Sequence, residues 1–148
     1  MKNNKRCSVY FDTNALERRH TGKELFLDAI EASDLFYNVR DVIIQLGLTD
    51  SVQLCIPEIV WREVKQHMVD KFNAAVDSFN GKIAEIKKSF GDLIDVRYAF
   101  NGLNSVADYP AYVENIAAEF LHNPKNFVKL ALLPRNGDIF NAIIENAV

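Results

Sequence analysis

Two short apolar segments separated by helical sequence constrain this fold more than any other feature of the chain. Residues 7–12, Cys-Ser-Val-Tyr-Phe-Asp, are typical of a buried strand, and residues 51–56 alternate Val52, Leu54 and Ile56 as a second strand does. Strands that are joined by a helical crossover lie parallel in their sheet. The order therefore predicts an α/β fold with a short parallel sheet between two layers of helices, a three-layer α/β/α arrangement.

Helix signals fill the sequence between these two segments. Thr21 and Glu24 form a capping box at the start of one predicted helix, whose apolar residues repeat as far as Ile30. Residues 33–34, Ser-Asp, provide a start for a second helix, and residues 47–50 end it. The chain up to residue 56 is therefore expected to run strand, helix, helix, strand.

A longer helical pattern follows the second strand. Its apolar residues fall alternately three and four residues apart in one heptad seam: Val69, Phe72, Val76, Phe79, Ile83, Ile86 and Phe90. The seam predicts one long helix that ends near Gly91, and a second helix must cover it. Residues 111–121 carry the best matching apolar pattern, so a helical hairpin is expected, with a candidate strand at residues 93–98 between its two helices.

Length and composition favour a single domain. A chain of 148 residues, 49% of them apolar, can bury about two-thirds of the surface that its unfolded form exposes. We interpret residues 1–148 as one domain that includes the helical hairpin. Residues 138–144 are predicted to form a last helix, opened by Asn136-Gly137 and a capping Asp138.

Charge and cysteine content narrow the setting and the partners. A formal net charge of -3 excludes binding of polyanions by bulk charge alone, so a nucleic acid must be held by a local cluster. No apolar run approaches the roughly 18 residues of a membrane-spanning helix. Cys7 and Cys55 lie in the predicted strands and no apolar leader is visible, which favours a reducing cytoplasm, with a disulfide as the minor alternative.

Two carboxylates are candidates for chemistry because of where they fall in this pattern. Asp12 ends the first strand, at the edge where open parallel sheets bind ligands, although an Asp there often only caps the next helix. Glu63 lies one to two turns into the helix after the second strand, beside Ile59 and Val60. On a partly apolar stripe it would need a cation, whereas at the edge of the stripe it would be an ordinary surface Glu. His67, one turn later, either lines the same cleft or lies on the helix surface.

The sequence around these carboxylates resembles a known family. VYFDTNAL, residues 9–16, followed by IPEIVWREV, residues 56–64, resembles the first half of a PIN domain, the metal-dependent ribonuclease fold of the toxins in many bacterial toxin–antitoxin pairs. In that family an Asp ends the first strand with Thr and Asn beside it, and a Glu lies on the helix after the second strand. Asp12, Thr13, Asn14 and Glu63 occupy those places.

The chain departs from the family pattern in its last residues. Where the family has a third acid followed by Ala and two apolar residues, this chain has Asn141-Ala-Ile-Ile, and Asp138, one turn earlier, is the nearby carboxylate that could substitute. The family continues with another strand that carries a fourth Asp, whereas this sequence ends at Val148. We therefore expect an N-terminal portion that lacks the C-terminal strands of the family. The smallest members have no such hairpin, so the resemblance also implies that residues 69–133 are an inserted helical hairpin.

The resemblance implies an endoribonuclease that uses Mg²⁺ or Mn²⁺. Asp12, Glu63 and Asp138 would be the metal ligands, and Thr13 and Asn14 would orient the Asp12 carboxylate or touch a substrate phosphate. The metal would activate a water for attack on RNA or another single-stranded nucleic acid. An amide at Asn141 in place of a carboxylate predicts a weak or inactive enzyme.

Two other interpretations of the function stay open beside the nuclease. A catalytically silent PIN-like module would bind a protein, such as an antitoxin, or a nucleic acid through the hairpin, and a small-molecule phosphatase is the third alternative. Lysines along the hairpin could follow a phosphate backbone, but both signs of charge mix there, which favours a solvated helix face. Self-association is left open.

Overall fold

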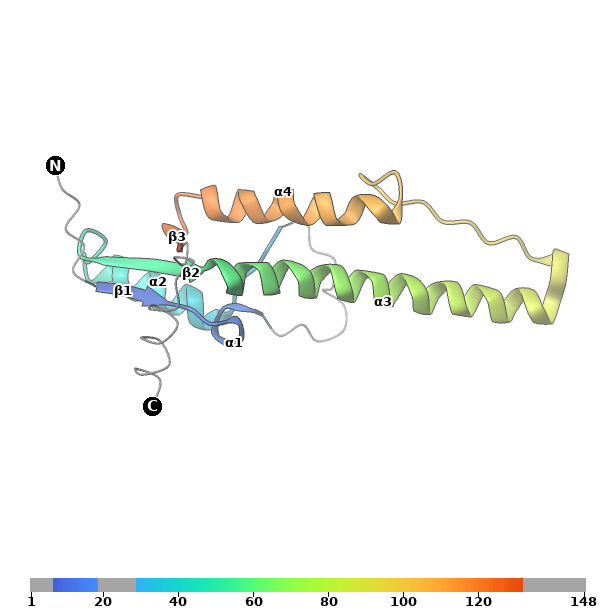
Figure 1. The fold of residues 1–148 in the computed structure, drawn as a ribbon, viewed down its shortest axis with the longest axis horizontal. Coiled ribbons are helices and arrows are strands. Elements are labelled where there is room, and N and C mark those ends of the chain that lie inside the picture. The colour runs from blue at the N-terminus through green and yellow to red at the C-terminus, as the bar shows by residue number, and fades with distance from the viewer. Residues whose placement is uncertain (1–6, 19–28, 132–148) are drawn as a thin grey trace.

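A computed structural model describes residues 7–18 and 29–131, and they form a mixed α/β fold (Figure 1). The three strands of the described chain make one open parallel sheet in the order β1-β2-β3: β1 is Cys7–Tyr10, β2 is Val52–Pro57 and β3 is Val128–Ala131. Leu54 of β2 pairs with Val9 on one side and Val128 on the other. The predicted α/β class and the parallel pairing of the first two strands are confirmed.

Two helices lie between β1 and β2 in the described chain. The short α1, Thr13–Leu16, follows β1, and α2 is Asp34–Gln45. Ser33 starts α2 as predicted, because its Oγ accepts a hydrogen bond from the backbone N–H of Phe36 at 3.1 Å. The predicted capping box at Thr21 and Glu24 lies outside the described residues. Ile30, expected at the end of that helix, is not helical.

The main core lies where the helices pack on the sheet. Its fully buried side chains include Phe36 of α2 and Leu54 and Ile56 of β2. Trp61, at the start of the long helix α3, stacks on Phe120 with ring centroids 5.5 Å apart, so it joins both helices of the hairpin to this core. Trp61 is itself only 3% exposed.

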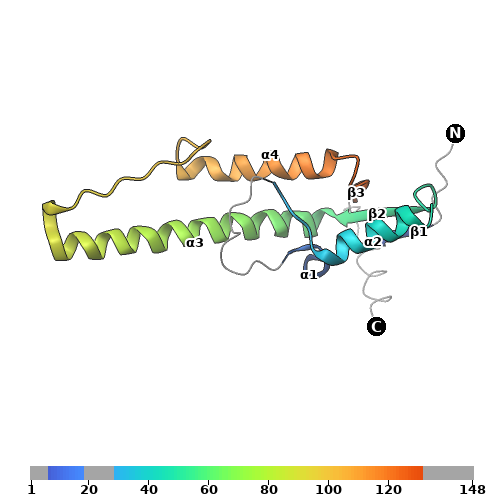
Figure 2. The same cartoon turned by 180° about the vertical axis from the view of Figure 1, so that it is seen from behind.

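The predicted helical hairpin is confirmed and forms a long arm. Helix α3, Glu58–Phe90, ends at Gly91, and α4, Tyr109–His122, packs beside its first part (Figure 1). Figure 2 shows the same arrangement from behind. The first turn of α4 lies well short of the tip of α3. We call α3, α4 and the connecting residues 91–108 the arm.

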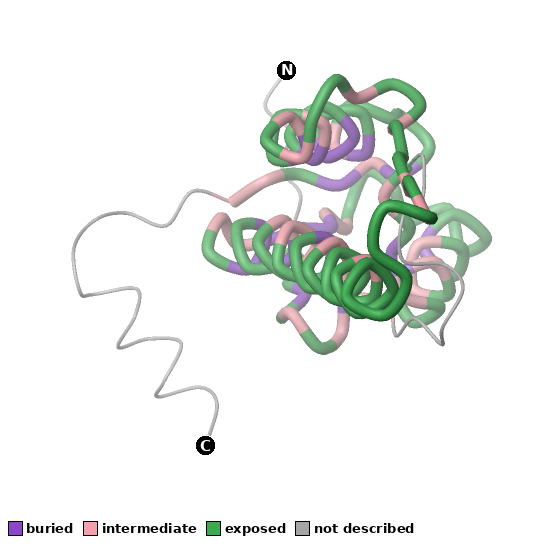
Figure 3. Tube along the Cα trace, turned by 90° about the vertical axis from the view of Figure 1, so that its right-hand side faces the viewer, coloured by how far each residue is buried: buried purple, intermediate pink, exposed green. Residues whose placement is uncertain are grey.

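A second, smaller core holds the two helices of the arm together. Phe72 of α3 stacks on Tyr109 of α4 with ring centroids 3.8 Å apart, and Val113 is buried beside them. Burial raises the pKa of the Tyr109 phenol above its ordinary value, and the neighbouring Tyr112 adds to the shift. Figure 3, viewed toward the tip of the arm, shows buried residues on the side of α4 that faces α3 and an exposed arm tip.

Two segments differ from the sequence prediction. Residues 93–98, the candidate strand, form none: Gly91–Leu93 is a short 3₁₀ turn and the chain then runs irregularly to a second turn at Val106–Asp108. The structure adds β3, which the sequence analysis did not predict and which lies inside the range 69–133 assigned to the hairpin. Its four residues pair with β2 in the sheet. The predicted helix at 138–144 lies outside the described residues.

Candidate functional site

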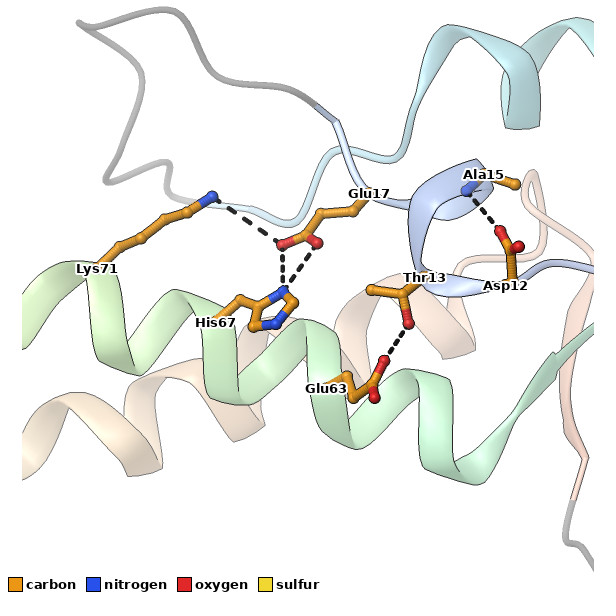
Figure 4. Close-up of polar contacts among 7 residues, drawn as sticks. All are labelled: Asp12, Thr13, Ala15, Glu17, Glu63, His67 and Lys71. Atoms are coloured by element: carbon orange, nitrogen blue, oxygen red, sulfur yellow. Dashed lines mark hydrogen bonds and ion pairs between the residues drawn. The ribbon is translucent and has the colours of Figure 1, made fainter.

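Asp12 lies where the end of β1 turns into α1. Its backbone is extended, and its Oδ1 accepts a hydrogen bond from the backbone N–H of Ala15 at 2.7 Å, so Asp12 is the N-cap of α1 (Figure 4). The side chain is exposed, and Oδ2 forms no hydrogen bond or ion pair with any other residue of the described ranges. Asp12 therefore has the simple capping role that its position allowed, and the capping hydrogen bond uses only one of its two carboxylate oxygens.

Glu63 lies in the second turn of α3 and faces α1. Its Oε2 accepts a hydrogen bond from the Thr13 hydroxyl (Figure 4). The side chain is exposed, and Ile59, one turn earlier, is 54% exposed, so the structure contradicts the interpretation of Glu63 as an acid on an apolar stripe that needs a cation. It supports the other interpretation, an exposed Glu at the edge of the stripe.

The Thr13 hydroxyl brings the two predicted carboxylates to one turn of chain. Thr13 follows Asp12 directly, so Asp12 and Glu63 flank the same residue although they are far apart in the sequence. Both follow neighbouring parallel strands, β1 and β2, at the carboxyl edge of the sheet. Asn14, which was predicted to orient Asp12 or to touch a substrate phosphate, is exposed. It lies beside Glu17 and Lys71 at a hollow of about 110 Å³.

A charged cluster around His67, which is 45% exposed on the surface of α3, continues this site along the helix. His67 Nδ1 lies 2.9 Å from Glu17 Oε2, and Lys71 Nζ lies 4.0 Å from Glu17 Oε1 (Figure 4). Glu63, His67 and Lys71 are spaced four residues apart, so they share one face of the helix, and this face is turned toward α1. That spacing was the available signal, but nothing in the sequence showed that Glu17 would face it.

The donor set for a cation is partial. Within residues 7–18 and 29–131, no group of three or more His, Cys, Asp or Glu side chains could hold a metal ion. Asp138 and Asn141, the remaining predicted site residues, lie outside the described ranges. Mg²⁺ is often held by one or two carboxylates with waters and substrate phosphates, so the oxygens of Asp12 and Glu63 fit its chemistry as part of a coordination shell.

Among the helices in residues 7–18 and 29–131, none combines the length and the apolar character that a membrane span requires. Compared with known proteins, the chain matches no family model, no curated protein and no solved structure. The resemblance to PIN domains stays a prediction from the two sequence motifs.

Proposed function

We propose that this chain is a PIN-like, metal-dependent endoribonuclease whose site is built on Asp12 and Glu63. One observation carries the proposal: the Thr13 hydroxyl donates to Glu63, which brings the helix after β2 against the residue that follows Asp12 at the end of β1. Two carboxylates then lie beside one turn at the carboxyl edge of a parallel sheet, the usual place for a ligand in such folds. The three-layer PIN-like arrangement, with residues 69–133 as an insertion, belongs to the same proposal.

The chemistry we propose divides between the protein and a bound Mg²⁺ or Mn²⁺. When bound, the cation would supply an activated water and would neutralise negative charge on the phosphodiester. Asp12 and Glu63 offer it one anionic oxygen each. The Ala15 N–H and the Thr13 hydroxyl hold the two carboxylates in fixed orientations, as hydrogen-bonding partners of metal ligands commonly do. Asn14, exposed on the same turn, would contact a substrate phosphate.

We propose that the remaining ligand comes from Asp138. Asn141, in place of a carboxylate, lowers the negative charge that the site offers to a divalent cation, so the chain as given is expected to be a weak nuclease. Restoring the acid in Asn141→Asp should raise both Mn²⁺ affinity and RNA cleavage.

A second candidate is a catalytically silent PIN-like module that binds a protein, such as an antitoxin, or a nucleic acid. The observation that favours it is the lack of a three-residue metal group in the described part of the chain. It predicts no cleavage with either metal and no effect of Asn141→Asp.

A cleavage assay on fluorogenic single-stranded RNA with Mn²⁺, paired with Mn²⁺ titration calorimetry, tests the nuclease. Asp12→Asn is the main variant, because Asn caps a helix as well as Asp and the fold is kept. It should lower cleavage by more than about 100-fold, since changes in groups that merely orient ligands already cost about 10- to 100-fold. Asp92→Asn, at an exposed carboxylate near the tip of the arm, is the control with the same change in charge.

The results separate the candidates. Equal cleavage by wild type and Asp12→Asn, or cleavage that persists without a divalent cation, would overturn the nuclease. Turnover of p-nitrophenyl phosphate with no cut RNA would instead identify a phosphatase.

A further inference from the structure

Two polar contacts hold α1 along the first part of α3 in one register. Thr13 and Glu17, at the two ends of α1, contact Glu63 and His67 in the same order (Figure 4). Both pairs are four residues apart in the chain, and four helical residues rise about 6 Å. A phosphodiester held at Glu63 therefore lies one helical turn from the imidazole ring of His67, on the same face of α3.

The two nitrogens of the His67 ring have different surroundings. Nδ1 lies 2.9 Å from Glu17 Oε2 and 3.1 Å from Oε1, and an ionised carboxylate only accepts hydrogen bonds, so Nδ1 carries a proton. Nε2 forms no hydrogen bond or ion pair with any residue of the ranges 7–18 and 29–131. A proton that the ring gains or loses is therefore exchanged at Nε2.

The backbone around Glu17 fixes the carboxylate that faces the ring. The Glu17 N–H donates to the Thr13 carbonyl oxygen at 2.9 Å and ends α1, and Glu17 forms an antiparallel bridge with Ala32. A carboxylate bonded to one ring nitrogen sets the tautomer and the orientation of an imidazole. Glu17 therefore leaves Nε2 of His67 as the atom that can meet a substrate.

The other charged groups near the ring are of both signs. Lys71 Nζ lies 4.0 Å from Glu17 Oε1, and Arg18, which lines the same hollow, pairs with Glu31. Glu63 is one turn before the ring on α3, and Lys71 is one turn beyond it. The imidazole is therefore closer along this face to Glu63 than the lysine is.

Hydrolysis of a phosphodiester needs a proton at the oxygen that leaves, because a nucleoside alkoxide is a poor leaving group. Carboxylates that ligate a metal are deprotonated, so Asp12 and Glu63 in that role have no proton to donate. Transfer of a proton by a positioned side chain typically speeds a reaction by about 10²- to 10⁴-fold. An imidazole does this near neutral pH.

We propose that His67 is the general acid of this site and that Glu17 is its positioning residue. The inference rests on the proposed nuclease function. As the oxygen of water bonds to phosphorus, the bond from phosphorus to the leaving nucleoside oxygen breaks and its electron pair stays on that oxygen. The Nε2 proton of the imidazolium moves to the same oxygen. The proton of the water passes to solvent, and the neutral ring regains a proton from solvent.

Two substrates that differ in the leaving group test the role of His67. Single-stranded RNA releases an alkoxide, which needs a proton, whereas the p-nitrophenyl ester of thymidine 5′-phosphate releases a phenolate, which needs none. With Mn²⁺, His67→Ala should lower kcat on RNA by about 100-fold or more and on the ester by less than about threefold. His122→Ala, at an exposed position in the last turn of α4, is the matched control and should cleave both as the wild type does.

The same pair of assays is run in the Asn141→Asp chain, so that a large loss stays measurable. Circular dichroism confirms that each variant is folded. Calorimetry should give the same Mn²⁺ affinity for His67→Ala and for wild type, because the imidazole is not a metal ligand in this proposal.

A measurement on the metal-free protein tests Glu17. Two-bond ¹H–¹⁵N NMR spectra report which nitrogen of a neutral imidazole carries the proton. The ring of His67 should carry it on Nδ1 in the wild type, and Glu17→Ala, which removes the acceptor, should shift the ring toward the Nε2 tautomer. Glu17→Ala should also lower kcat on RNA by about 10- to 100-fold, as loss of an orienting group does.

The possible failures are distinguishable. RNA cleavage that His67→Ala leaves unchanged would overturn the inference and leave the nuclease standing, whereas no metal-dependent cleavage by either parent chain would overturn both. Equal losses on RNA and on the ester would make His67 a base or a structural contact between α1 and α3. A loss of Mn²⁺ affinity in His67→Ala would make it a metal ligand, and an Nε2 tautomer in the wild type would overturn the role of Glu17.

Discussion

At the scale of single residues, the Thr13 hydroxyl connects the two elements that carry the candidate ligands. We expect Thr13→Val to lower Mn²⁺ affinity by about 10- to 100-fold, because Glu63 loses the donor that orients it. The free energy of unfolding should change by less than about 1 kcal/mol, since the hydrogen bond is exposed. Titration calorimetry with Mn²⁺ and urea unfolding measure the two effects.

Thr13→Ser is the control for this prediction, because it keeps the hydroxyl and removes only a methyl group. It should bind Mn²⁺ as the wild type does. A loss of metal affinity that is the same in Thr13→Ser and Thr13→Val would show that packing of the methyl group, and not the hydrogen bond to Glu63, supports the site.

The candidate site was predictable from the sequence to the extent that local pattern decides it. Asp12 and Glu63 follow predicted strands, and parallel strands bring their carboxyl ends to one edge, so the approach of Glu63 to Thr13, the residue next to Asp12, follows from topology. The pairing of Glu17 with His67 depends on how α1 lies against α3, fifty residues apart in the chain. The orientation of two helices is set by tertiary packing, which no local spacing encodes.

At the scale of secondary structure elements, substitutions at two glycines of the arm measure the effect of backbone conformation on stability without an effect of packing. A Cβ added at Gly81 or at Gly91 would meet no atom within 4 Å. Gly81 lies in the interior of α3, whereas Gly91 ends the helix with φ of +57°. Gly81→Ala should stabilise the arm by about 0.5–1 kcal/mol through helix propensity, and Gly91→Ala should destabilise it by about 1–2 kcal/mol through strain.

Urea unfolding followed by far-UV circular dichroism measures both glycine variants, each serving as the control for the other. Opposite signs are expected because only the backbone conformation differs between the sites. If both substitutions destabilise the arm, helix propensity does not control stability at Gly81, and the prediction for this position is wrong.

The helices were easier to predict than the strands. Ser33, the heptad seam and Gly91 mark helix starts, faces and ends within a few residues, and α2, α3 and α4 follow those marks. A strand of four residues has no such marks. β3 is a strand because β2 has a free edge beside it, while residues 93–98, with a similar apolar content, lie along the arm away from the sheet and stay irregular.

At the scale of the whole molecule, the two cores differ in size and in their dependence on each other. The main core joins the sheet with all four described helices, whereas the arm core has three buried residues, Phe72, Tyr109 and Val113. The base of the arm is part of the main core through Trp61 and Phe120. The arm is therefore expected to open while the sheet stays folded, and the sheet cannot unfold without the arm.

Amide hydrogen exchange on two matched Phe→Ala variants tests this asymmetry. Each truncation of a buried Phe costs about 3–5 kcal/mol where it lies. Phe72→Ala should speed exchange in residues 69–90 and 109–116 and leave β1 and β2 protected, because it lowers only the free energy of the arm opening. Phe36→Ala, in the main core and 0% exposed, should speed exchange in both regions, since global unfolding exposes every amide. Uniform acceleration in Phe72→Ala would mean that sheet and arm unfold as one cooperative unit.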